Sequence, residues 1–142
     1  MTHSDRVLDH VRRPRNVGSL VRDDPRVGTG LVEGEGCGDL VRFQIRVKPS
    51  TCVIEEACFK AYGCGPTIAA SSVATEWVRG RSIVDAQRVD SRAIVDALDL
   101  SESRAHASTL VVMALRAAID DYMNRRRGAM VCGIADESGS EP

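Results

Sequence analysis

The residues of this chain best suited to chemistry are two thiols, a carboxylate and an imidazole, at Cys37, Cys64, Asp39 and His106. Cys64 lies between two glycines in the stretch KAYGCGPTIAASS, residues 60–72. Glycines allow tight turns and close approach, which suits a thiol that a metal or another sulfur must reach. Pro66 fits the first turn of a helix that Gly80 stops, and a helix N-terminus favours a thiolate. A cysteine that merely fits a turn is the alternative interpretation.

The other three residues could join Cys64 in a metal site. Cys37 and Asp39 are two residues apart in EGCGDL, at the entrance to a predicted strand, so in an extended backbone both side chains point the same way. His106 is expected in the first turn of a long helix, where the dipole disfavours imidazolium and leaves a nitrogen free to bind metal. If that helix begins beside the strand ends, the four groups converge.

Two thiolates, an imidazole and a carboxylate suit a tetrahedral zinc ion, or a two-iron cluster with two ligands per iron. Their spacing lacks the close chelate pattern of a CxxC pair. Taken singly, His106 could be a surface or cap residue, and Asp39 could accept hydrogen bonds in a turn. The case for a metal site therefore depends on the combination.

Composition limits the class of protein. The 142 residues suffice for one domain with a buried core. The charges of the 19 basic and 20 acidic residues nearly balance, and aromatic residues make up only 4% of the chain. Nothing in this composition indicates a surface that binds nucleic acid. The N-terminus MTHSDRVLDH is too polar for a signal peptide, and no apolar run approaches membrane-spanning length. We expect a cytoplasmic protein without nucleic-acid or membrane partners, whose five cysteines are free, metal-bound or reactive.

The first half of the chain predicts one short helix and three strands. A helix is expected from near Ser4 to Pro14, and the glycine-rich residues 27–35 read as an irregular strand. The clearest strand has apolar residues that alternate with polar ones, so one face belongs to the core and the other to water; they are Val41, Phe43, Ile45 and Val47. After a turn at residues 49–51, a third strand is expected. Four small or apolar residues at alternate positions should share one of its faces: Val53, Ala57, Phe59 and Ala61.

The second half predicts helices. The helix that contains Pro66 should end at Trp77 or Val78, the SIVD stretch at residues 82–85 has capping-box form, and Asp90 or Ser91 can cap a short helix to Leu98. A last helix is expected from about Arg104 to Arg126, followed by an acidic tail at residues 129–142 that should be disordered. Residues 1–128 then form one α+β domain, a three-stranded antiparallel sheet with helices packed on one face.

Four stretches together resemble the IscU/NifU-type iron-sulfur cluster assembly scaffolds, over residues 4 to about 126. They are VLDHVRRPRNVG, VGTGLVEGEGCGD, FKAYGCGPTIAASSVATEWVRG and RAIVDALDL. The resemblance implies the IscU/SufE-like fold, a site where a labile 2Fe-2S cluster is built and handed on, and two kinds of partner: a cysteine desulfurase and recipient apoproteins. The family's ligand positions fall on Cys37, Asp39, Cys64 and His106.

Two departures from the family pattern affect these implications. The family has a third cysteine, a cluster ligand, after its histidine, and this chain has Ala107 there. The bacterial scaffolds also have a Leu-Pro-Pro-Val-Lys stretch that an Hsp70-type chaperone reads, whereas this chain has LSESR at residues 100–104. Ordinary cluster synthesis and chaperone-driven release are therefore both in doubt.

No other cysteine is expected to replace the missing one. The last helix would span roughly 33 Å, and Cys132 beyond its end could reach back at most roughly 20 Å. Cys58 lies six residues before Cys64 on the same predicted strand, about 20 Å away if extended, and Cys52 is farther. Both are expected to be strand or turn residues.

These residues are compatible with three functions. The preferred one is a scaffold or carrier of a labile 2Fe-2S cluster or iron. The alternative is a divergent zinc-binding paralogue that modulates a cysteine desulfurase. An enzyme with Cys64 as nucleophile and His106 as base is permitted by the residue types. It is disfavoured because the sequence indicates no oxyanion donor or substrate pocket, so we expect a protein that is not an enzyme.

Overall fold

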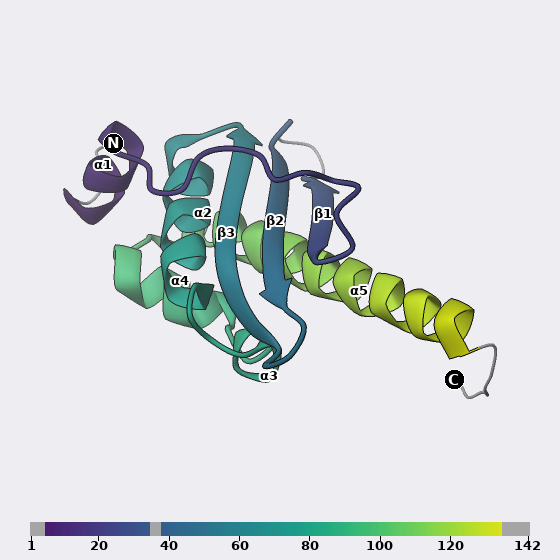
Figure 1. Cartoon of the computed structure of the whole chain (residues 1–142). Helices are drawn as coiled ribbons and strands as arrows, with labels where there is room; N and C mark the ends of the chain where they lie inside the picture. Colours follow the sequence, from purple (N-terminus) through teal and green to yellow (C-terminus); the bar gives the residue numbers. More distant parts are fainter. Residues whose placement is uncertain (1–4, 35–37, 135–142) are drawn as a thin grey trace.

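The computed structural model describes residues 5–34 and 38–134, with side chains described up to residue 126 (Figure 1). One candidate ligand, Cys37, lies outside the described residues, as do residues 135–142 of the predicted tail.

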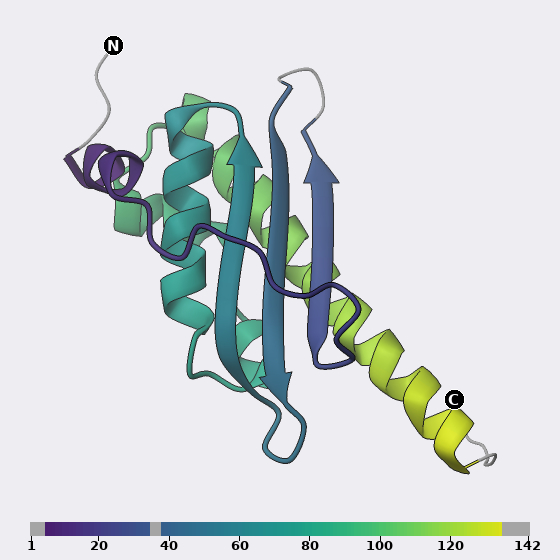
Figure 2. The ribbon, with the colours of Figure 1, turned by 45° about the horizontal axis from the view of Figure 1, so that its top comes forward.

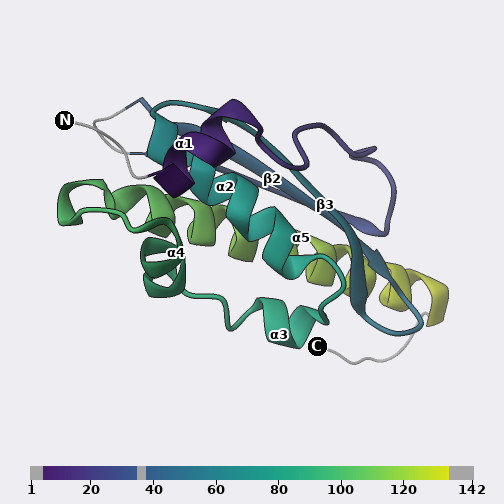
Figure 3. The same cartoon turned by 90° about the vertical axis from the view of Figure 1, so that its left-hand side faces the viewer.

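The three predicted strands form one antiparallel sheet in the order β1-β2-β3. The strands are β1 (Val27–Glu33), β2 (Leu40–Lys48) and β3 (Val53–Tyr62). Two helices, α2 (Gly65–Val78) and α5 (His106–Ile134), pack directly against one face, and Figure 3 shows both on the same side of the sheet. The predicted α+β class and the placement of helices on one face are confirmed.

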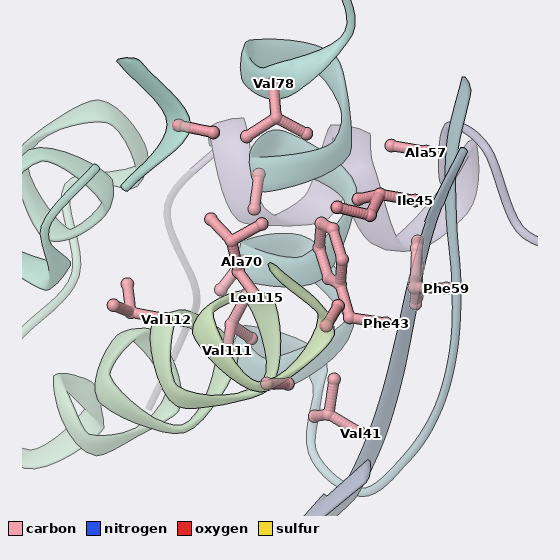
Figure 4. Close-up of a cluster of buried hydrophobic side chains, with 14 of the residues drawn as sticks. Val41, Phe43, Ile45, Ala57, Phe59, Ala70, Val78, Val111, Val112 and Leu115 are labelled. Atoms are coloured by element: carbon pink, nitrogen blue, oxygen red, sulfur yellow. The ribbon is translucent and has the colours of Figure 1, made fainter. Parts of the chain in front are cut away.

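The core lies between this sheet face and the two helices. The alternating residues of β2 supply its centre, and Phe43 and Ile45 are fully buried against small or branched residues of α2 and α5, among them Ala70, Val111 and Leu115 (Figure 4). Ile83, Ile94 and Leu98 of the short helices complete the same cluster. Alternate residues of the strands form one apolar face of the sheet, and this face packs against the apolar faces of two helices, as the sequence pattern requires.

The other face of the sheet is not simply open to water. The segment between α1 (Asp5–Arg12) and β1 crosses it, as Figures 1 and 2 show. Gln44 on that face is only 2% exposed, because its amide oxygen accepts a hydrogen bond from the Leu20 backbone N–H at 2.9 Å and its amide nitrogen donates to Thr29 Oγ1 at 3.0 Å. The expectation of a solvated face is therefore wrong at Gln44.

A β-bulge shifts the parity of β3. Arg46 pairs with Glu56 and Val47 with Ile54, so Glu55 is the extra residue. Ala57 and Phe59 occupy the core face as predicted, but before the bulge the buried residue is Ile54 rather than Val53. The expected parity is therefore wrong at Val53.

The glycines of β1 allow α5 to approach closely instead of making the strand irregular. β1 pairs with β2 without a register shift. A Cβ atom at Gly28 would lie 2.8 Å from Cβ of Tyr122, and one at Gly30 would lie 2.6 Å from the backbone nitrogen of Ala118. Only glycine at these two positions lets the helix backbone rest on the strand.

The remaining helices begin where their caps predict. Ser82 Oγ accepts from the Asp85 N–H at the start of α3 (Ile83–Ala86), and Asp90 does the same for Ala93 in α4 (Ser91–Leu98). A short 3-10 turn, η1 (Glu102–Arg104), precedes α5. The end predicted for the last helix at Arg126 is wrong, since α5 continues to Ile134 and includes the first part of the predicted tail.

Candidate metal centre

Three of the four predicted ligands meet at one end of the sheet. Asp39 directly precedes β2, Cys64 directly precedes α2, and His106 is the first residue of α5. One ligand atom from each, a carboxylate oxygen, a sulfur and an imidazole nitrogen, lies within 4.8 Å of the others. Residues up to 67 positions apart in the chain are thus brought together by the antiparallel pairing of β2 with β3 and by the return of the chain through α4 to α5.

The carboxylate of Asp39 is buried and held at both oxygens. Its side chain is 4% exposed. Oδ1 accepts a hydrogen bond from the Cys64 backbone N–H at 3.3 Å, and Oδ2 accepts one from the Thr67 hydroxyl at 2.7 Å. On the backbone, the carbonyl of Asp39 accepts from the Gly34 N–H at 2.7 Å. A buried carboxylate with these donors has a fixed direction.

Cys64 presents its sulfur beside that carboxylate. It is the N-cap of α2, with φ −76° and ψ 164°, and its carbonyl accepts the N–H groups of Thr67 and Ile68. Its sulfur lies 3.5 Å from Asp39 Oδ2 and 3.3 Å from Thr67 Oγ1. The residue is solvent-exposed. The thiol is therefore accessible to a reagent from outside while its backbone is fixed by the start of the helix.

His106 completes the group from the solvent side. Its Nε2 atom lies 3.9 Å from Asp39 Oδ2, and its side chain is 51% exposed. Oδ2 of Asp39 therefore faces both the sulfur and the imidazole.

These donor atoms suit zinc or iron. A thiolate, an imidazole and a carboxylate are the ligands that zinc takes in proteins, and thiolate with histidine also holds iron in clusters. The buried carboxylate offers oxygen ligands for a cation, and the exposed residue Cys64 and the half-exposed imidazole leave an entry path from solvent. Three ligands fill three of the four positions around a tetrahedral metal, so a fourth ligand can still bind.

The remaining cysteines lie elsewhere. Cys58 is buried in β3, where burial raises the pKa of its thiol, and Cys52 is exposed in the β2–β3 turn. Cys132 lies in α5, 26 residues after His106, about 39 Å along the helix axis. The strand and turn positions expected for Cys58 and Cys52 are confirmed, and Cys132 is far from the site along α5.

Position 107 lies inside the protein. Ala107 is 0% exposed, although it directly follows the half-exposed His106. The first turn of α5 therefore presents the imidazole outward and the methyl group of Ala107 inward. Within the described residues, the site contains one thiol, that of Cys64.

Sequence reasoning missed two residues that shape this site, Gly63 and Thr67. Gly63 has φ +147°, and a Cβ atom there would lie 2.5 Å from Cγ of Asp39, so the absence of a side chain makes room for the carboxylate. Thr67 lies in the first turn of α2 and is fully buried. The position of Gly63 next to Cys64 in the sequence could have indicated its role. No sequence pattern indicated the role of Thr67.

Comparison with known proteins agrees with this architecture. Residues 2–129 match the NifU-like N terminal domain family. The chain is 45% identical over 126 residues to the iron-sulfur cluster assembly scaffold protein IscU of Azotobacter vinelandii, covering 89% of this chain and 98% of that protein. It is 44% identical to IscU of Escherichia coli strain K12, with the same coverage.

Solved structures share the fold at lower sequence identity. The N-terminal part of a nitrogen-fixing NifU-like protein from Brucella abortus superposes with a TM-score of 0.67 at 19% identity, over 84% of this chain and 93% of that one. The SUF-system protein FiSufU from Fervidobacterium islandicum gives a TM-score of 0.69 at 16% identity, over 82% and 96% of the two chains. On the evidence of the match over nearly its whole length, the chain belongs to the NifU-like N terminal domain family.

Proposed function

We propose that this protein is an iron-sulfur cluster assembly scaffold, which holds a labile 2Fe-2S cluster and passes it to apoproteins. One observation carries the proposal: a sulfur, an imidazole nitrogen and a buried carboxylate oxygen converge within 4.8 Å, in a chain about 45% identical to IscU scaffold proteins over 89% of its length. The family relationship supplies the kind of cargo, and the convergence supplies groups that can bind it.

Each ligand position has a distinct part in this proposal. Cys64, an exposed residue, offers a sulfur ligand for iron and a thiol that can receive persulfide sulfur. His106 adds a nitrogen donor from the solvent side, and Asp39 adds a hard oxygen donor from the interior. Cys37, two residues before Asp39, is proposed as the fourth ligand. A cluster held partly by oxygen and nitrogen is bound less firmly than one held by four thiolates, which suits a cargo that must leave.

The proposed partners follow from the same chemistry. A scaffold needs a source of sulfur, and a cysteine desulfurase supplies it as persulfide. The cluster assembled on the scaffold must then pass to a recipient apoprotein. Chaperone-assisted release is not part of the proposal, because residues 100–104 read LSESR and form the turn before α5. Among the described residues, no helix is long and apolar enough to cross a membrane.

Ala107 favours one alternative function. With a fully buried methyl group at the position where the family resemblance implies a third ligand cysteine, the described part of the site has a single thiol. Together with Cys37 this set would suit one closed zinc site. The protein would then be a zinc-binding paralogue that modulates a cysteine desulfurase.

Anaerobic reconstitution distinguishes the two functions. The purified protein is incubated with ferrous iron, cysteine, a cysteine desulfurase and a thiol reductant, which reduces persulfide sulfur to sulfide, and bound iron and acid-labile sulfide are then measured per chain. A scaffold binds both in equal amounts, whereas a zinc module retains zinc and gains neither. Cys64→Ser should abolish cluster binding, because it removes the only thiol of the described site.

Cys52→Ser provides the matched control. It also removes an exposed thiol, but that thiol lies in the β2–β3 turn. Equal loss of iron and sulfide in the two variants would show that the cluster is not held at the Cys64 site.

A further inference from the structure

A buried hydroxyl group contacts two of the proposed ligands without being a ligand itself. Thr67 is 0% exposed. Its Oγ1 donates to Asp39 Oδ2 at 2.7 Å and lies 3.3 Å from the sulfur of Cys64. The oxygen and the sulfur that this hydroxyl contacts belong to two of the three residues that could hold a metal ion, Asp39, Cys64 and His106.

The backbone fixes where this hydroxyl points. Thr67 lies one turn into α2, and its N–H donates to the carbonyl of the N-cap residue Cys64 at 3.1 Å. The helix restricts the side-chain rotamers of a β-branched residue, so the hydroxyl has few alternative directions. The residue that caps the helix and the residue that holds the carboxylate therefore belong to the same helical turn.

The hydrogen bond from Thr67 selects one orientation of the Asp39 carboxylate. Oδ2, the oxygen that accepts it, is also the oxygen that faces Cys64 Sγ at 3.5 Å and His106 Nε2 at 3.9 Å. A carboxylate oxygen has more than one lone pair, so it can accept from the hydroxyl and still offer an acceptor site toward a metal. Oδ1 is occupied separately by the Cys64 N–H.

We infer that Thr67 is a positioning residue for the metal site: its hydroxyl holds Asp39 Oδ2 in the direction from which the carboxylate can bind metal together with Cys64 and His106. The inference rests on the proposed metal-binding function of these residues and adds to it a fifth side chain, one that lies outside the predicted ligand set. Hydrogen-bonded partners of ligands orient them, and loss of such a partner lowers metal affinity about 10- to 100-fold.

Metal titration of two variants at this position tests this role. Thr67→Val keeps the size and branching of the side chain and removes the hydroxyl, and Thr67→Ser keeps the hydroxyl. Purified metal-free protein is titrated with Co²⁺, and Zn²⁺ affinity is obtained by displacement of the bound Co²⁺. We expect Thr67→Val to bind Zn²⁺ about 10- to 100-fold more weakly than the natural protein. Thr67→Ser should bind nearly as tightly as the natural protein.

Ser71→Ala is the matched control. Ser71 is also fully buried in α2, and its hydroxyl donates to the carbonyl of Thr67 rather than to a ligand side chain. This variant removes a buried helix hydroxyl one turn away, so its Zn²⁺ affinity should equal that of the natural protein. Thermal unfolding of each metal-free variant separates loss of affinity from loss of fold.

A double-mutant cycle identifies the ligand through which Thr67 acts. In an Asp39→Ala background there is no carboxylate to orient, so adding Thr67→Val should leave the Zn²⁺ affinity unchanged. The sulfur-to-cobalt charge-transfer band should keep its intensity in saturated Thr67→Val, because the number of thiolate ligands is the same.

The inference is overturned if Thr67→Val binds Zn²⁺ as tightly as the natural protein, or if its effect persists in the Asp39→Ala background. These results are distinct from failure of the scaffold function. A protein that loses Zn²⁺ affinity in Thr67→Val but gains no iron or sulfide on reconstitution would support the positioning role and contradict the scaffold.

Discussion

Gly63 lies against the carboxylate of Asp39, and the space that a side chain would need at Gly63 is filled by that carboxylate. A Cβ atom at Gly63 would come 2.5 Å from Asp39 Cγ and 3.1 Å from its Cβ. Gly63 directly precedes Cys64 and, because it has no side chain, leaves room for the Asp39 carboxylate at the start of the neighbouring strand.

We therefore predict that Gly63→Ala disrupts the site even though it alters no ligand. The added methyl group must push Asp39 away, and φ +147° is also strained for alanine, at a cost of about 1–3 kcal/mol. Co²⁺ titration should show weaker binding, and urea unfolding should show lower stability. Unchanged metal affinity in a folded Gly63→Ala protein would mean that Asp39 is not a ligand or that the loop adapts freely.

The buried position of Ala107 makes a second variant informative. Ala107→Cys places a thiol next to His106 in the first turn of α5, near the helix N-terminus. Since the site of the substitution is 0% exposed, the larger side chain should cost about 1 kcal/mol of stability.

If the rest of the site is an intact scaffold and the first turn of α5 can turn the new thiol toward it, Ala107→Cys should accept more persulfide sulfur and hold more cluster per chain than the natural protein. Mass spectrometry of sulfur adducts and visible absorption report the two steps separately. No gain in either, with the fold retained, would favour the zinc-binding alternative.

The contact between β1 and α5 gives a prediction about stability alone. A Cβ atom at Gly30 would lie 2.6 Å from the Ala118 nitrogen and 2.9 Å from the Ala117 side chain. Because the near atoms include helix backbone, Gly30→Ala should lower the free energy of unfolding by about 1–3 kcal/mol. Leu31→Ala, at the next residue of the strand and 55% exposed, should change it by less than about 0.5 kcal/mol. Similar urea midpoints for these two variants would contradict the tight packing.

The attachment of α1 to α2 should depend on pH. His10 Nδ1 lies 2.8 Å from the hydroxyl oxygen of buried Ser72, which also accepts the Arg15 N–H. Burial and, secondarily, the charge of Arg15 lower the pKa of His10 from its ordinary value of 6.5, while Glu76 and Asp9 oppose the shift.

Because the folded-state pKa is the lower one, the unfolded chain binds more protons between the two values. The stability that neutral His10 contributes is thus present above pH 6.5 and is lost as the pH falls through the folded-state pKa. Thermal unfolding between about pH 7.5 and about pH 5.5 should show a smaller acid loss in His10→Gln than in the natural protein. An equal loss would assign the effect to other groups.

Local sequence signals accounted for the elements of the fold. Ser82 and Asp90 cap the helices that they were expected to cap, because a cap depends only on residues within one turn. The alternation in β2 identified its core face correctly at Val41, Phe43 and Ile45. The approach of Asp39, Cys64 and His106 was also anticipated, since each was placed at the end of an element.

What the sequence did not reveal depends on contacts between distant segments. Gln44 is buried because the segment that contains Leu20 crosses its face of the sheet, and strand periodicity contains no information about such a crossing. The bulge at Glu55 is a property of pairing with β2. The role of Thr67 arises from a residue 28 positions away, so a threonine in a helix gave no indication of it.

Transfer of a cluster to an apoprotein tests the scaffold function most directly. The protein is loaded anaerobically with ferrous iron and with sulfur from a cysteine desulfurase in the presence of a thiol reductant, separated from free reagents, and mixed with an apo-ferredoxin. The proposal predicts that the iron and acid-labile sulfide bound to this chain appear in the ferredoxin, and that Cys64→Ser abolishes the transfer. A protein that keeps zinc, takes up neither iron nor sulfide, and leaves the ferredoxin in its apo form would contradict it.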